Sequence, residues 1–130
     1  MASSDHLAAL KSADWNAWRD ENPSITPDLT DIALVGLDLS GKNLSGADLS
    51  RTKLDGAMLD GASLLRAHLQ GASLRGTSLQ RADLSETDLE YQTLDGVSLV
   101  GARLRGVNLK NASVREANLT ACDLSGAKLE

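Results

Sequence analysis

The feature that most constrains the fold is an apolar residue at every fifth position. Between positions 29 and 129 this residue is always Leu, except at Val114, and no insertion or deletion shifts the phase. A period of five fits neither the helical period of about 3.6 residues nor the alternation of a strand. In a helix, successive leucines would lie about 140° apart and spread around every side. A chain that turns a corner every five residues instead brings each Leu back to one interior.

The columns beside this Leu agree with such corners. Two residues before each Leu the side chain is small, most often Ala, and we expect it to point inward. Two residues after it Gly is common, and Gly tolerates the backbone angles of a tight corner. The residues directly before and after the Leu are mostly polar and are expected to face solvent. Lys42 breaks the inward pattern where the end of the core lets it reach water.

Units such as Ala47-Asp48-Leu49-Ser50-Arg51 and Ala117-Asn118-Leu119-Thr120-Ala121 resemble the pentapeptide-repeat family, whose unit reads A-(D/N)-L-x-x. The resemblance implies an all-β solenoid, a right-handed quadrilateral β-helix with four pentapeptides per coil and about five coils. We therefore predict two parts. Residues 1–28 are an N-terminal capping helix and linker, and residues 29–130 are the pentapeptide-repeat β-helix.

The segment before the repeat predicts a cap. Ser3 or Ser4 can begin a helix that we expect to run to about Asp20, and Asn22-Pro23 ends it. Because the ends of solenoids need covering, the apolar side of this helix is predicted to cover the first coil. The alternative is that its two Trp form a partner site. The apolar side comprises Leu7, Leu10, Trp15 and Trp18.

No matching cap follows the repeat, which stops at Leu129-Glu130. An uncovered coil would expose Leu124 and Leu129 together with unpaired strand edges, which invites pairing with another chain. Three explanations compete: end-to-end homodimerisation through the C-terminal coil, a longer natural chain, and a tolerated frayed end.

Composition excludes several classes of protein. The net charge of −5 disfavours nucleic acid as a partner. The single cysteine, Cys122, rules out an internal disulfide and replaces an inward Ala. No apolar run has the length of a membrane span. The first ten residues lack the basic start of a secretory signal, so a cytoplasmic location is predicted.

Groups that could perform catalysis do not converge in the sequence. His6 and His68 are isolated, and His68 is expected between Asp48 and Asp88 as a solvated histidine. The serines lack a nearby base, and the glycines are spaced by fives rather than grouped in a phosphate loop. We predict that the protein is not an enzyme and binds neither a cofactor nor a metal.

Charges twenty positions apart would lie side by side on successive coils. One such column alternates in sign through Asp55, Arg75, Asp95 and Arg115, and Arg66 would lie beside Glu86. Such pairs are individually weak but favour one register. Some relatives protect DNA gyrase from quinolones by imitating the negative charge of DNA. Residues 29–130 hold 13 Asp and Glu against 11 Lys and Arg, which makes a DNA mimic the alternative rather than the main prediction.

Two surface features are candidate partner contacts. The side centred on Leu39, Leu59, Leu79, Leu99 and Leu119 has no cation among its outward residues, and Met58 and Val100 are apolar there. The second feature is Tyr91, at a corner usually held by Gly, followed by Gln92 at an inward position. A buried Gln needs hydrogen-bond partners, so we predict a local bulge or an outward-turned side chain. Tyr91 is interpreted either as a partner anchor or as a packing irregularity.

We therefore predict a non-catalytic structural or protein-interaction scaffold with unknown protein partners. The alternatives are a DNA-mimicking regulator of DNA gyrase or another topoisomerase, and a self-assembling module that stacks through its C-terminal coil.

Overall fold

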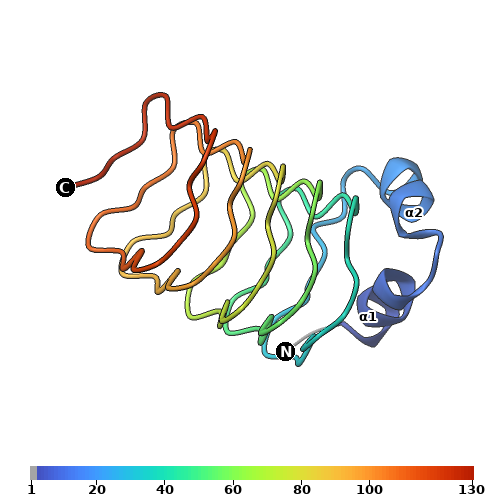
Figure 1. Cartoon of the computed structure of the whole chain (residues 1–130). Helices are drawn as coiled ribbons and strands as arrows, with labels where there is room; N and C mark the ends of the chain where they lie inside the picture. Colours follow the sequence, from blue (N-terminus) through green and yellow to red (C-terminus); the bar gives the residue numbers. More distant parts are fainter. Residues whose placement is uncertain (1–2) are drawn as a thin grey trace.

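The computed structural model describes residues 3–130 and places a stack of coils behind two short helices (Figure 1). Helix α1 (Ser4–Lys11) and helix α2 (Trp15–Glu21) lie together at one end of the stack, and the C-terminus lies at the other. Parallel bridges join residues twenty apart, from Asp28 with Asp48 to Asn108 with Lys128. Each coil is thus twenty residues long, and residues 28–127 form five coils, which begin at residues 28, 48, 68, 88 and 108.

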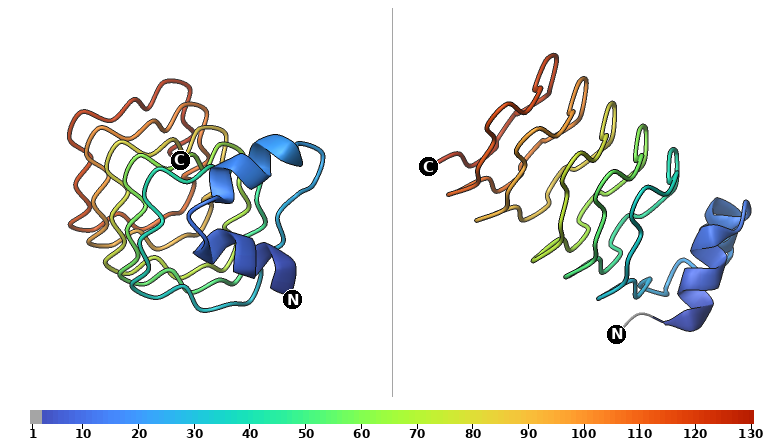
Figure 2. Two further views of the ribbon diagram at one scale, coloured as in Figure 1. Left: turned by 90° about the vertical axis from the view of Figure 1, so that its right-hand side faces the viewer. Right: turned by 60° about the horizontal axis from the view of Figure 1, so that its bottom comes forward.

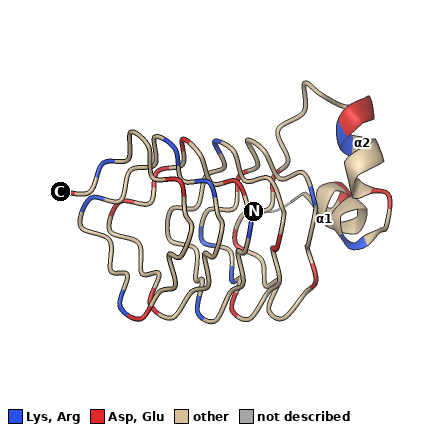
Figure 3. Ribbon diagram, turned by 45° about the horizontal axis from the view of Figure 1, so that its top comes forward, with Lys and Arg blue, Asp and Glu red and all other residues tan. Residues whose placement is uncertain are grey.

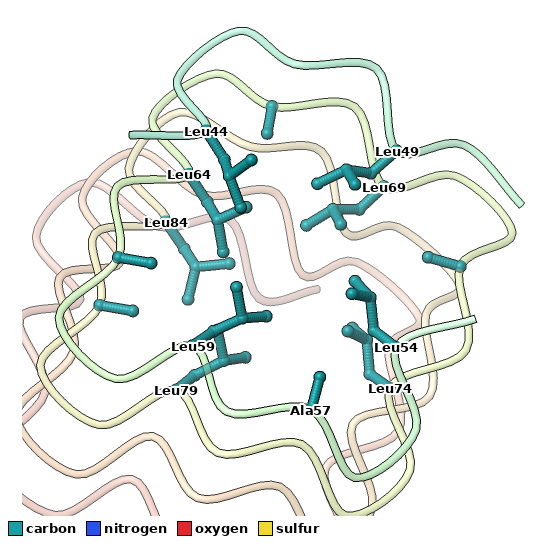
Figure 4. Close-up of a cluster of buried hydrophobic side chains, with 14 of the residues drawn as sticks. Leu44, Leu49, Leu54, Ala57, Leu59, Leu64, Leu69, Leu74, Leu79 and Leu84 are labelled. Atoms are coloured by element: carbon teal, nitrogen blue, oxygen red, sulfur yellow. The ribbon is translucent and has the colours of Figure 1, made fainter. Parts of the chain in front are cut away.

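Each coil has four sides, because the chain turns after every fifth residue (Figure 2). The sides stack into four faces, and Figure 4 shows the leucines of all four pointing into one interior. The faces are numbered here by their central residues. Face 1 holds Leu29, Leu49, Leu69, Leu89, Leu109 and Leu129; face 2 holds Leu34, Leu54, Leu74, Leu94 and Val114; face 3 holds Leu39, Leu59, Leu79, Leu99 and Leu119; face 4 holds Leu44, Leu64, Leu84, Leu104 and Leu124.

The corners share one backbone conformation. The residue two after each central residue has a positive φ at every corner between positions 31 and 126, whether it is Gly or one of nine other residues. The following small residue closes the turn, as where the amide of Ala47 donates to the carbonyl of Leu44 at 3.0 Å. A positive φ at the third residue is the mark of a type II turn. The frequent Gly in this column therefore reflects left-handed backbone.

The core consists of the stacked leucines and the small inward residues beside them. The central leucines between positions 29 and 109 are all buried, as are inward alanines such as Ala47, Ala57 and Ala82. Burial of each Leu contributes about 1.5–3 kcal/mol. Exposure rises in the last coil, where Val114 is 38% exposed and Leu129 is 62% exposed.

The N-terminal segment is two helices, so the prediction of one helix to about Asp20 was wrong. Ser12 interrupts it with an extended backbone, φ −87° and ψ 159°. Its hydroxyl donates to the carbonyl of Ala9 at 2.9 Å and accepts from the amide of Asp14 at 3.2 Å. A serine side chain that bonds its neighbouring backbone competes with helix continuation. Neither α1 nor α2 is long and apolar enough to cross a membrane.

Candidate functional site

Helix α2 supplies hydrogen-bond partners to the exposed edge of the first coil. The indole nitrogen of Trp15 donates to the carbonyl of Asn43 at 2.8 Å. Asn16 accepts from the amide of Asn43 at 2.7 Å and donates to the carbonyl of Gly41 at 3.0 Å. Arg19 donates to the carbonyl of Ser45 at 2.7 Å. Three side chains of a helix thereby replace the strand that would otherwise pair with residues 41–45.

The predicted cap residues differ in burial. Leu10 and Trp15 are fully buried, whereas Leu7 and Trp18 are half-buried against the core. The rings of Trp15 and Trp18 stack with their centroids 5.2 Å apart. His6 lies against Trp18, and its Nδ1 accepts from the amide of Asp28 at 2.8 Å. This bond ties α1 to the first residue of the first coil.

Most outward carboxylates and carboxamides are used by their own repeat. Asp48, for example, accepts from the amide of Ser50 two residues later at 3.0 Å, and Asp83 does the same for Ser85 at 2.9 Å. Such Asx turns explain why Asp or Asn so often precedes the Leu. The turn residues of this kind are Asp28, Asp38, Asn43, Asp48, Asp83, Asp88, Asn108, Asn118 and Asp123.

On face 2, outward carboxylates also accept hydrogen bonds, but from residues of the next coil. Asp55 accepts from the Ser73 hydroxyl at 2.5 Å and from the amide of Arg75 at 2.9 Å. Asp95 binds Ser113 and Arg115 in the same way, at 2.6 and 2.8 Å. The hydroxyl of Ser73 holds the pKa of Asp55 below its usual range, and Ser113 does so for Asp95. The carboxylates in this charge column thus bond the backbone amides of the arginines.

Opposite charges are interspersed along the coils (Figure 3). The Arg66 guanidinium lies 2.5 Å from Glu86, and that of Arg51 lies 2.7 Å from Asp31. Arg105 lies 3.7 Å from Asp123. All three pairs are largely solvent-exposed, so each contributes little to stability. They nevertheless pair opposite charges on adjacent coils.

Gln92 points into the solenoid, and the predicted bulge or outward-turned side chain was wrong. Its side chain is 8% exposed, and its Nε2 donates to the carbonyl of Ala72 one coil earlier at 2.8 Å. No residue is inserted, because Tyr91 keeps the common corner φ and its amide bonds Lys110 at 3.0 Å. The inward amide is tolerated because it finds a backbone acceptor.

The irregularity takes another form, a gap in the backbone ladder between the third and fourth coils. On faces 1 and 2, six amides of each coil joint normally donate across it. Between the second and third coils these are Leu49, Arg51, Leu54, Gly56, His68 and Ser73, at 2.8–3.0 Å. At the next joint, His68 and Asp88 keep a parallel bridge, but four of the counterparts, all in the described part of the chain, make no such bond: Gly71, Leu74, Gly76 and Thr93.

The gap is confined to one side of one joint. Six equivalent bonds return between the fourth and fifth coils. Faces 3 and 4 of the gapped joint keep theirs, including Leu79 to Ser98 and Leu84 to Arg103, both at 2.8 Å. Figures 1 and 2 both show the yellow-green and orange coils farther apart on one side than any other neighbours.

Two glutamines reach across the gap. Besides Gln92, Gln70 donates through Nε2 to the carbonyl of Asp88 at 3.5 Å. A surface groove of about 280 Å³ lies at this corner, lined by residues 71–75 and 91–93. Tyr91 stands at its rim with 73% of its surface exposed. Sequence reasoning singled out Tyr91 and Gln92 but missed Gln70, because nothing in its column separates it from Gln80.

The other candidate contacts lie elsewhere. Met58 is 43% exposed on face 3, and Val100 is half-buried two coils later on the same face. Leu124 is half-buried and Leu129 exposed at the last coil. The structure therefore does not bring Met58, Val100 and Tyr91 into one patch, since Tyr91 lies at the corner between faces 1 and 2.

Groups that could perform chemistry stay apart. His68 bridges between Asp48 and Asp88, as its register predicts. Within residues 3–130, no three His, Cys, Asp or Glu side chains are grouped to hold a metal ion. The Cys122 thiol donates to the carbonyl of Leu99, and burial raises the pKa of that thiol.

Comparison with known proteins agrees with the coil geometry. The profile of the family described as pentapeptide repeats (8 copies) matches the chain three times in succession, over residues 28–64, 62–99 and 98–130. No curated protein sequence matches the chain. The pentapeptide repeat protein alr5209 of Nostoc PCC 7120 is similar in structure at 27% identity and a TM-score of 0.51. The match covers 88% of this chain and 93% of that one.

Two further solved structures match with lower TM-scores. One is a pentapeptide repeat protein of the Arabidopsis thaliana thylakoid lumen, at 30% identity, 78% and 71% coverage and a TM-score of 0.37. The other is QnrB1, a plasmid-mediated fluoroquinolone resistance protein, at 25% identity, 75% and 58% coverage and a TM-score of 0.39. Proteins of this family are right-handed quadrilateral β-helices and are generally non-catalytic. The repeat, the four-sided coil and the profile together show that this chain belongs to the pentapeptide repeat family.

Proposed function

We propose that this protein is a non-catalytic scaffold that binds a protein partner at the Tyr91 corner. The observation that supports this role is the 73% exposed phenol of Tyr91 beside the groove between the third and fourth coils. Tyr is among the side chains that most often dominate binding energy at interfaces. We also propose that the protein acts in the cytoplasm.

A scaffold role is consistent with how the other side chains are used. Inward residues fill the core, and outward carboxylates bond the backbone of their own or the next repeat. Catalysis would require a nucleophile or acid–base pair held together. The described histidines, His6 and His68, serve a cap bond and an isolated ladder position.

Affinity capture from the native lysate tests the Tyr91 corner. Wild-type protein, Tyr91→Ala and Val35→Ala are immobilised, since Val35 is another exposed apolar residue, far from the groove. We expect a protein that wild type and Val35→Ala retain and Tyr91→Ala loses. Identical retention by all three would contradict the proposal. Lys substitutions at Met58 and Val100 test the cation-free face in the same assay.

A second candidate function is self-association through the last coil. Val114 and Leu129 are partly or largely exposed there, and the amides of residues such as Leu119 and Leu124 have no backbone acceptor. Another strand paired with this edge would cover the apolar side chains and give the amides acceptors. Light scattering over a concentration series should show dimers that Leu129→Asp abolishes, whereas a monomer at all concentrations would argue against it.

The gyrase-regulator alternative has less support in the surface. Negative charges on the coils alternate with positive ones and do not form an acidic rod (Figure 3). A supercoiling assay with micromolar protein would decide, because a DNA mimic should inhibit the enzyme or protect it from quinolones.

A further inference from the structure

The gap between the third and fourth coils exposes two unpaired strand edges within the solenoid. On one edge the amides of Gly71, Leu74 and Gly76 lack a backbone partner; on the other, so do the carbonyls of Glu90, Thr93 and Asp95. The amide of Thr93 is also unpaired, whereas His68 and Asp88 keep a parallel bridge at one end of the gap. Residues 67–76 and 88–95 are called the strand slot here. Buried backbone groups without partners are costly, so such a slot favours a ligand that satisfies them.

The sequence of face 2 distinguishes this joint from the joints on either side of it. At the joints before and after it, an Asp of one coil accepts from a Ser and a backbone amide of the next: Asp55 with Ser73, and Asp95 with Ser113. At the strand slot these two positions hold Arg75 and Thr93, which make no such bond. The slot thus lacks the Asp–Ser hydrogen bond as well as the backbone hydrogen bonds named above.

The chemical class of the ligand follows from the groups on the edges. Amides and carbonyls alternate along both edges, as in a parallel sheet, and an extended polypeptide offers the complementary pattern along its whole length. The slot already holds two groups of this kind. The carboxamides of Gln92 and Gln70 resemble peptide units, and they bond the carbonyls of Ala72 and Asp88 across the gap.

We propose that the strand slot binds an extended polypeptide segment by strand addition, with displacement of the two glutamine side chains. Faces 3 and 4 keep their ladder and form the hinge line about which the slot widens. The bond from Ser98 to Thr77, on face 3, is already 3.4 Å long. The inferred partner chemistry rests on the proposed function, because Tyr91 at the rim would contact the same segment.

Packing restricts which segments fit. The leucines under the slot, Leu69, Leu74, Leu89 and Leu94, are at most 2% exposed. An added strand would separate these leucines by one strand spacing, so its inward-facing side chains must be apolar and fill the layer that opens between them. Outward positions are free to vary.

Hydrogen exchange with a probe peptide tests the slot. The probe is a capped ten-residue peptide that repeats residues 107–116, which pair with the fourth coil in the folded chain. In the free protein the four unpaired amides, those of Gly71, Leu74, Gly76 and Thr93, should exchange at least about tenfold faster than those of Leu49, Leu54 and their neighbours. Saturating peptide should slow the four amides by about tenfold or more.

Gln92→Ala restores the small inward residue and lets Thr93 reach the carbonyl of Ala72. We expect its slot to close, so that the four amides are protected without peptide and peptide affinity falls at least about tenfold. Gln80→Ala, on face 3 away from the slot, should behave as wild type.

Two results would overturn the strand slot: protection of the four amides in the free wild-type protein, or unprotected amides whose exchange millimolar peptide does not slow. Failure of the broader proposal is distinguishable from this. If the protein captures a partner through Tyr91 but does not bind the peptide, only the strand slot is refuted. If it binds the peptide but captures no Tyr91-dependent partner, only the scaffold proposal is refuted.

Discussion

The two ends of the solenoid complete their outer coils differently. At the first coil, α2 buries Trp15 and supplies hydrogen bonds from Trp15, Asn16 and Arg19 to residues 41–45. At the last coil, nothing within residues 3–130 covers the edge, and exposure reaches 62% at Leu129. The same leucine column therefore contributes unequally along its length. In a solenoid each coil is stabilised by its neighbours, so a coil with one neighbour is the first to open.

The largest expected effect is at the covered end. Trp15→Ala should lower the free energy of unfolding by about 3–5 kcal/mol, because it removes a fully buried indole and its bond to Asn43. Urea denaturation measures this loss. Trp18→Ala, at a half-buried ring, should cost clearly less. A loss below about 1 kcal/mol for Trp15→Ala would show that α2 does not stabilise the first coil.

The next prediction compares two leucines of face 3. Leu59→Ala, in the interior of the stack, should cost about 2–5 kcal/mol, whereas Leu119→Ala, half-buried in the last coil, should cost about 1 kcal/mol. Both variants remove the same atoms, so the difference between their losses of unfolding free energy measures how well neighbouring coils cover each position. Equal losses in urea denaturation would contradict the comparison and would point to a covered last coil in solution.

A smaller effect is expected from the polar part of the cap. Asn16→Ala should cost about 1–2 kcal/mol, because the amide of Asn43 and the carbonyl of Gly41 lose their partner. Asn16→Asp keeps the acceptor and should recover part of the loss. Asn118→Ala in the last coil removes bonds only within its own turn and should cost less. The reverse order, measured by thermal unfolding, would weaken the assigned role of Asn16.

The smallest effect concerns acid. The pKa of Asp95, which links the fourth and fifth coils, lies below its usual range because Ser113 donates to it. A carboxyl with a lowered folded pKa stabilises the protein above its ordinary pKa of about 4, and this contribution is lost as pH falls through the folded value. Asp95→Asn should therefore shrink the drop in melting temperature between pH 7 and pH 3. Ser113→Ala should shrink it too; an unchanged drop in both would refute the linkage.

The period of five was enough to predict the interior and the corners. A coil that turns every five residues returns Leu29 and its successors to one core, and the frequent Gly two residues later indicated the tight corners. The number of sides came from the family resemblance, and the bridges twenty residues apart agree with it. The interruption at Ser12 was missed because its decisive contacts are bonds between the Ser12 hydroxyl and the backbone within three residues, which a helical wheel does not represent.

The position of the candidate site could be predicted from the sequence, but its hydrogen bonding could not. Tyr91 and Gln92 break their columns and so mark the irregular corner. The outcome at Gln92 depended on whether a carbonyl one coil away would be free, and that depends on the loss of the Thr93 amide bond to Ala72. Such a contact joins residues twenty apart and depends on coil spacing, which the sequence of one repeat does not set.

The cross-coil bonds of face 2 bear on how chains of this kind change length in evolution. Asp55 and Ser73 meet only when their repeats stay four units apart, whereas an Asx turn such as that of Asp48 is complete within one unit. Duplication of twenty residues would add a coil and preserve both kinds of bond. Duplication of five would rotate every later face by a quarter turn and, wherever it falls between an Asp and its Ser, would separate that pair. Selection for these bonds would therefore make such solenoids grow and shrink by whole coils.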